Sequence, residues 1–227
     1  IPLPHSAGRR RTEGGEFLVP AHAEIVIEGT VDLVNLEPEG PYHEMYGYMG
    51  IAKKENYVMR VDALSHRRNP WVMNSFTGVV AEYCTAAQAA ATVYSLRKSH
   101  PQVVDYYAPH DSQGLAYLSI RKDAPGQGLK VAQAIANFNP LSRIVIVVDD
   151  DIDIMNSAAV RFAIGSRWQP ATATEILKDK RAFSLDPGSP DRKTTSEAII
   201  DATRQWPEEG GPPVYQELNR TVLERAV

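Results

Sequence analysis

The stretch Arg143-Ile144-Val145-Ile146-Val147-Val148-Asp149 decides the fold class of this 227-residue chain. A continuous run of β-branched apolar residues is typical of a strand inside a sheet that is covered on both faces. Helix and strand patterns alternate around it, with helices expected at 85–99, 129–137 and 156–166 and strands at 103–108 and 115–120. This alternation predicts a small α/β layer domain.

The sequence before residue 85 has a different texture. Strand patterns are expected at 17–20, 23–31, 51–64 and 71–76. Short strands at this spacing are typical of a sandwich or barrel. At the other end, residues 186–213 are rich in proline, glycine and charge and predict an extended arm, followed by a last helix at 214–225. The fold class is therefore α/β with some α+β character.

Composition excludes several classes of protein. The formal net charge is −4 and, outside Arg9-Arg10-Arg11, basic residues are scattered, so no nucleic-acid partner is expected. The single cysteine, Cys84, rules out an internal disulfide and fits a reducing compartment. Because no run of 18 apolar residues occurs, we expect no membrane partner and a cytoplasmic location.

Residues 39–50, Glu-Gly-Pro-Tyr-His-Glu-Met-Tyr-Gly-Tyr-Met-Gly, are the most informative stretch for function. Glu39 and Glu44 lie five residues apart across a Gly-Pro turn, among tyrosines and methionines. Such a setting can desolvate one carboxylate and leave the other paired or wet, which divides acid and base roles between them. On spacing alone, a surface hairpin with two solvated glutamates is the stronger interpretation, since paired carboxylates are common on protein surfaces.

Several segments together resemble the UbiD-type decarboxylases, which use prenylated FMN and include ferulic acid and hydroxybenzoate decarboxylases. The matching segments follow the family's order and are Val19–Gly29, Glu39–Tyr48, Leu64–Pro70, Thr77–Gly78, Ile144–Asp153, Ser166–Pro170 and Ile200–Thr203. The resemblance implies the end of a flavin-binding split β-barrel at 1–82 and a linking helix at 83–100. It further implies an α/β oligomerisation domain at 101–185 and a tail arm with a terminal helix at 186–227.

The resemblance also implies roles for the two glutamates. The family uses a Glu-Arg-Glu network, and its glutamates fall on Glu39 and Glu44 of this chain. Glu44 is then the proton donor to carbon, and Glu39 pairs with the arginine and orients the network. The alternative for Glu44 is a carboxylate that caps the turn at Tyr46-Gly47.

Other positions receive weaker assignments from the same resemblance. Met45 would line the flavin or fill a gap in the core, and Tyr42 and His43 would face the substrate pocket, although His43 can equally be a surface histidine. His66 and Arg67 would meet the cofactor phosphate, or else form a structural salt bridge.

The network's arginine, the ligands for a divalent metal (Mn or Mg) and K, and part of the phosphate site belong to the family's N-terminal half, which has no counterpart here. We therefore expect a C-terminal portion or a split subunit of a homo-oligomeric enzyme, whose partner is the N-terminal half or a second subunit. The reaction expected is reversible decarboxylation of an aromatic or α,β-unsaturated carboxylic acid. The alternatives are a non-catalytic assembly subunit and an unrelated split-barrel flavin binder.

The run Asp149-Asp150-Asp151-Ile152-Asp153 allows two interpretations. Clustered carboxylates suit Mg²⁺ or Ca²⁺, but this run lacks the glycine and terminal glutamate of an EF-hand loop. Carboxylates after a strand and before a helix also cap backbone groups. A structural turn or subunit contact is the stronger interpretation, and no metal ligands are assigned in this chain.

Overall fold

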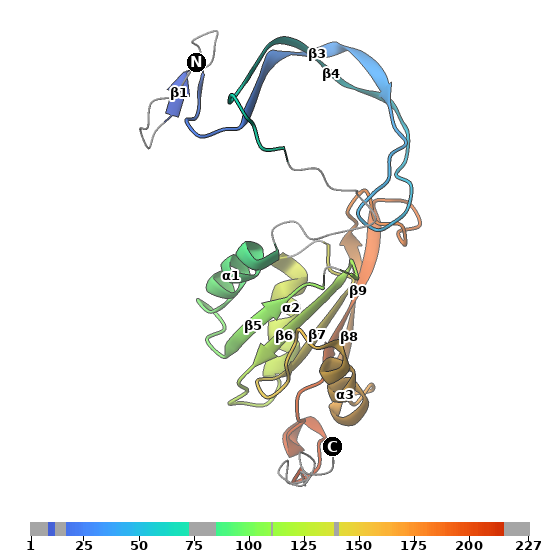
Figure 1. Cartoon of the computed structure of the whole chain (residues 1–227). Helices are drawn as coiled ribbons and strands as arrows, with labels where there is room; N and C mark the ends of the chain where they lie inside the picture. The colour runs from blue at the N-terminus through green and yellow to red at the C-terminus, as the bar shows by residue number, and fades with distance from the viewer. Residues whose placement is uncertain (1–8, 12–16, 73–84, 110, 139–140, 216–227) are drawn as a thin grey trace. The chain divides into compact units, whose positions relative to one another are not determined.

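The computed structural model describes residues 9–11, 17–72, 85–109, 111–138 and 141–215 (Figure 1). The chain divides into two compact units, Ile1–Val79 and Val80–Val227. The described helices are at most 12 residues long, and none is long and apolar enough to cross a membrane.

The first unit is built from antiparallel strand pairs. A short pair joins β1 (Arg9–Arg11) to β2 (Leu18–Pro20). A long ribbon joins β3 (Ile25–Glu39) to β4 (Lys53–His66), and its register runs from Ile25 opposite His66 to Glu39 opposite Lys53 (Figure 1). These strands confirm the β-rich character expected for this region. The described residues form no closed barrel.

The long ribbon is amphipathic. Because successive side chains of a strand point to opposite faces, the alternate residues Ile25, Ile27 and Val31 share one face of β3. A register shift beside Gly29 lets Leu64, Val61 and Met59 of β4 lie opposite this row. All of these apolar side chains are exposed to more than a third of their surface. A two-stranded ribbon is marginal by itself in water, so this face requires a covering layer.

The second unit contains one five-stranded sheet with the order β5-β6-β7-β9-β8. The bounds of its strands are β5 Val103–Tyr107, β6 Leu115–Ile120, β7 Ile144–Asp149, β8 Thr174–Arg181 and β9 Thr194–Asp201. The three central strands are parallel, and the two outer strands run antiparallel to their neighbours.

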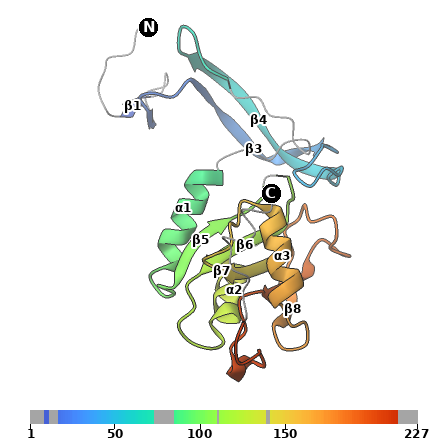
Figure 2. The same cartoon turned by 60° about the horizontal axis from the view of Figure 1, so that its bottom comes forward.

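Helices cover both faces of this sheet (Figure 2). The helices are α1 (Thr85–Leu96), α2 (Gln127–Phe138) and α3 (Ser157–Arg167), and a 3-10 turn follows at Pro207–Glu209. Val145 and Val147 pack in the core that α1 and α2 share, whereas Ile146 and Val148 pack in the core of α3. The apolar run of β7 is therefore buried on both faces, as its sequence predicts.

The expected extended arm at 186–213 is wrong. Strand β9 lies within it, between β7 and β8 in the middle of the sheet. The prolines and charges on both sides of Thr194–Asp201 concealed its short alternating pattern. The edge strand β8 was also not expected. Trp71 and Val72 are not in a strand, and the rest of that expected strand lies outside the described residues, as does most of the expected terminal helix.

Both edges of the sheet are blocked by local features. On β5, the register shifts between Val103 and Asp105, and the guanidinium of Arg97 donates to the carbonyls of Val103 (2.8 Å) and Val104 (2.6 Å). On β8, the register shifts after Leu177, where Asp179 has a φ of 55°. Bulges and charges of this kind prevent pairing with another strand.

Candidate functional site

The segment 39–50, which we call the carboxylate loop, connects β3 to β4. Its backbone closes on itself through hydrogen bonds from Glu44 N to Tyr48 O (2.9 Å), from Gly47 N to Glu44 O (2.9 Å) and from Gly50 N to Tyr42 O (2.8 Å). Gly40 and Gly47 both have a φ of 75°, a conformation that glycine adopts without the usual steric cost. The loop is therefore a small closed hairpin that fixes where Glu44 stands.

Glu39 is held by the first residues of β4. Its Oε2 accepts a hydrogen bond from Asn56 Nδ2 and lies 3.2 Å from Lys53 Nζ. The side chain of Glu39 is 37% exposed and that of Lys53 is 61% exposed, so the pair is accessible to water. Glu39 is thus a carboxylate with a cation beside it.

Glu44 has a different environment. Its side chain folds back over Gly50, where a Cβ added to the glycine would lie 2.7 Å from Oε1. Within the described residues no hydrogen-bond donor or cation holds this carboxyl group, which is half-buried. The loop therefore presents one paired and one unpaired carboxylate, the kind of asymmetry that separates two roles.

The remaining loop residues expected at the site lie beside these glutamates. Tyr42 and His43 are exposed, Met45 is half-buried, and the backbone of His43 bridges to Met49. The loop therefore brings together the five residues assigned to it from the sequence. Their contacts with a flavin or a substrate stay a prediction.

The structure does not bring His66 and Arg67 to the carboxylate loop. They lie at the opposite end of the ribbon, where His66 pairs with Ile25. Arg67 Nη1 forms an ion pair with Glu24 Oε1 at 2.6 Å, and Glu24 Oε2 accepts from Trp71 N at 3.0 Å. These bonds from Trp71 and Arg67 lower the pKa of Glu24. Of the two alternatives given for Arg67, the structure thus contains the salt bridge, with Glu24.

The acidic run 149–153 is engaged with arginines. Arg167, which is buried, donates to Asp149 Oδ2 (2.6 Å) and forms a fork with both oxygens of Asp151 (2.9 Å each). Arg204 reaches Asp151 Oδ2 at 2.7 Å. The Arg167 hydrogen bonds hold the pKa of Asp151 down to about 2, whereas burial raises the pKa of Asp149. The carboxylates of Asp149 and Asp151 are thus held by arginines, which favours the structural interpretation of this run.

A second buried ionic cluster was missed by the sequence analysis. Lys122 Nζ donates to Glu209 Oε2 (2.7 Å), Thr203 Oγ1 (2.8 Å) and Arg204 O (2.7 Å). Glu209 Oε1 also accepts from Gly126 N, just before α2, at 2.6 Å. Burial raises the pKa of Glu209, but these hydrogen bonds outweigh it and the pKa ends below its usual value. We call this cluster the Lys122–Glu209 latch; it fastens the segment after β9 to the start of α2.

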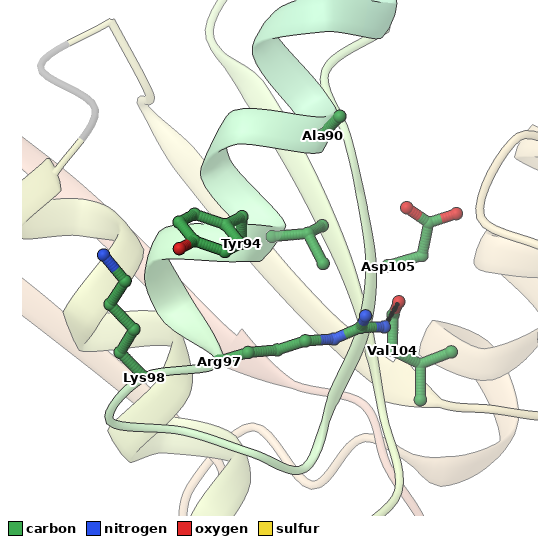
Figure 3. A pocket seen from close by; sticks show the side chains of 7 residues that line it. Ala90, Tyr94, Arg97, Lys98, Val104 and Asp105 are labelled. Atoms are coloured by element: carbon green, nitrogen blue, oxygen red, sulfur yellow. Dashed lines mark hydrogen bonds between the residues drawn. The ribbon is translucent and has the colours of Figure 1, made fainter.

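A surface hollow lies between α1 and β5 (Figure 3). Its lining includes Tyr94, Arg97, Lys98 and Asp105. Arg97 is bonded to the edge carbonyls of β5, and Lys98 Nζ lies 4.7 Å from the centre of the Tyr94 ring. Both cations are therefore engaged within the chain, and the hollow contains none of the residues expected at the active site.

Comparison with known families covers nearly the whole chain. Residues 9–80 match the 3-octaprenyl-4-hydroxybenzoate carboxy-lyase Rift-related domain, and residues 82–202 match the C-terminal domain of the same carboxy-lyase. An uncharacterized protein of Aeropyrum pernix is 34% identical over 206 residues, and one of Archaeoglobus fulgidus is 35% identical over 203. These alignments cover 88% and 86% of this chain but 42% of each relative, so the chain spans about two fifths of their length.

Solved structures of decarboxylases and UbiD-class enzymes are also similar to this chain. The UbiD-class enzyme HmfF from Pelotomaculum thermopropionicum in complex with FMN superposes with a TM-score of 0.79 and 27% identity, over 98% of this chain and 50% of that one. The vanillic acid decarboxylase of Sedimentibacter hydroxybenzoicus in its closed form superposes with a TM-score of 0.77 and 26% identity, over 92% of this chain and 46% of that one. An evolved dimeric form of HmfF in complex with prFMN superposes with a TM-score of 0.72 and 26% identity, over 98% of this chain and 48% of that one.

Proposed function

Because this chain belongs to the UbiD family of carboxy-lyases, we propose that it supplies the paired glutamates of a prenylated-FMN-dependent decarboxylase. The substrate is an aromatic or α,β-unsaturated carboxylic acid, and the rest of the site comes from polypeptide beyond these 227 residues. The observation that carries the proposal is the carboxylate loop, which holds Glu39 beside Lys53, whereas no cation among the described residues pairs with the carboxyl group of Glu44.

Decarboxylation breaks a carbon–carboxylate bond and leaves an electron pair on carbon, which must then take up a proton. When bound, prenylated FMN accepts this electron pair. We assign the proton transfer to Glu44, because carboxyl groups serve as general acids and bases and no cation among the described residues pairs with this one. Glu39, paired with Lys53 and hydrogen-bonded by Asn56, orients the polar groups around the substrate carboxylate.

The fit to the cofactor is partial. The carboxylate loop offers acid groups and the exposed rings of Tyr42 and Tyr48, which suit the edge and face of a flavin ring. Arg67, the expected phosphate ligand, is occupied by Glu24. The described residues also contain no group of three metal-ligating side chains. We propose that polypeptide beyond these 227 residues holds the phosphate, the divalent metal and K, as the family resemblance implies.

The split barrel belongs to the same proposal. The exposed apolar face of the β3–β4 ribbon, with Ile27, Val31, Met59 and Leu64, has the pattern of a sheet that packs against another layer. We assign that layer to the part of the relatives' sequence that this chain does not cover. A non-catalytic subunit that completes the pocket of a cofactor-carrying partner would use the same apolar face, so mutation of Glu44 must separate these two functions.

The test is turnover of the complete enzyme, produced in cells that make prenylated FMN. Glu44→Gln is expected to lower turnover by at least about 100-fold while the flavin absorbance of the purified protein is unchanged. Glu55→Gln, an exposed glutamate on β4, is the matched control and should be as active as wild type. Near-normal turnover of Glu44→Gln would refute the proton-donor role, and loss of bound flavin would make Glu44 structural.

A further inference from the structure

We propose that Gly50 is a positioning residue, whose missing side chain leaves the space that the Glu44 carboxyl group occupies. The inference rests on the role proposed above for Glu44. A Cβ built on Gly50 would lie 2.7 Å from Glu44 Oε1, 2.9 Å from Cγ and 3.2 Å from Cδ. Cβ atoms in proteins do not approach other heavy atoms to less than about 3.0 Å, so a methyl group at this position must move the carboxyl group.

The backbone does not explain this glycine. Gly40 and Gly47 of the same loop have positive φ values, whereas Gly50 does not. Alanine can therefore adopt the Gly50 conformation without strain. The three atoms nearest to the added Cβ all belong to the flexible Glu44 side chain. The effect of Gly50→Ala should accordingly be confined to the position of one carboxyl group.

The loop cannot absorb the methyl group by sliding Gly50 away. Gly50 N donates to Tyr42 O at 2.8 Å, and Glu44 N donates to Tyr48 O at 2.9 Å. The backbone bridge between His43 and Met49 lies between these two bonds. Together they fix the distance between the Glu44 and Gly50 main chains, so the side chain is the part that must yield.

The consequence concerns proton transfer. A proton donor must stand within hydrogen-bond reach of the atom that receives the proton, and a displacement of about 1 Å can cost on the order of 100-fold in rate. Gly50 therefore keeps Glu44 in place without touching substrate or cofactor itself.

The experiment compares wild type, Gly50→Ala and the control Gly165→Ala in the complete enzyme. Gly165 lies in α3, where an added Cβ would have no heavy atom within 4 Å apart from its chain neighbours and the backbone of its own helix. We expect Gly50→Ala to lower kcat 10- to 100-fold, by the same positional argument, with KM and bound flavin little changed. A crystal structure should show the Glu44 carboxyl group moved and the loop backbone in place.

Two results would overturn the inference: an unmoved Glu44 carboxyl group in the Gly50→Ala structure, or a kcat equal to that of wild type. Failure of the proposed function would look different. If Glu44→Gln retains turnover while Gly50→Ala still displaces the Glu44 carboxyl group, Gly50 positions Glu44 but Glu44 is not the proton donor.

Discussion

Replacing Glu209 by glutamine should destabilise the second unit through the Lys122–Glu209 latch. Glu209 Oε1 accepts from Gly126 N at 2.6 Å, and Oε2 accepts from Lys122 Nζ and Trp206 N, both at 2.7 Å. Both carboxylate oxygens thus face donors. The amide nitrogen of a glutamine would have to face one of these donors whichever way the side chain is turned.

The magnitude follows from burial. The Lys122 side chain is 2% exposed and that of Glu209 is 9% exposed, so removing the negative charge leaves a buried ammonium without its counter-ion. Breaking a buried pair in this way costs about 3–5 kcal/mol. Lys122 keeps Thr203 Oγ1 and Arg204 O as acceptors, which favours the lower end. For a chain of this size, about 3 kcal/mol lowers the Tm by about 6–12 °C.

The assay is urea and thermal unfolding followed by tryptophan fluorescence, since Trp206 lies within the latch. The matched control is Asp150→Asn, which breaks the 2.8 Å pair with Arg121, a side chain that is 77% exposed. Exposed pairs contribute less than about 1 kcal/mol. Equal losses in the two variants, or a loss below about 1 kcal/mol for Glu209→Gln, would refute the reasoning.

Three further changes test other parts of the second unit. The pKa of Asp151 is about 2 in the folded chain, below its unfolded value, so its contribution to the free energy of unfolding should be complete above about pH 4 and disappear as the pH falls toward 2. Unfolding midpoints measured across this range should fall less steeply for Asp151→Asn than for wild type, and parallel pH profiles of the two would contradict this. Arg97→Ala should cost about 1–3 kcal/mol by freeing two carbonyls at the edge of β5 and promote self-association in sedimentation, whereas Lys98→Ala should do neither. Gly128→Ala should destabilise the second unit by more than about 1 kcal/mol, because the added Cβ would lie 2.0 Å from the buried Asp201 Oδ2. A denaturation midpoint equal to that of Gly165→Ala would show that the Asp201 side chain can move aside.

The parts of the fold that could be predicted depend on local pattern. β6, β7 and α3 follow from runs and periodicities of six residues or more, and the carboxylate loop follows from its Gly-Pro turn and its glutamates. β9 could not be predicted, because it owes its central place to pairing with β7 and β8. The Lys122–Glu209 latch joins residues 87 positions apart, and only the folded chain brings them together. The ion pair between Arg67 and Glu24 likewise joins residues 43 positions apart, so local sequence pattern could not predict it.

The Lys122–Glu209 latch also bears on where ligands can act in this chain. In open α/β sheets, ligands bind outside the carboxyl ends of the parallel strands, with anions at a helix N-terminus. Here that position is taken by Glu209, which the chain itself delivers beside Gly126 and Lys122. A tethered carboxylate has a high effective concentration, in the millimolar range even for a flexible linker. Free phosphates and carboxylates must therefore compete with this tethered carboxylate for the Gly126 amide and the Lys122 ammonium, which disfavours anion binding at the start of α2.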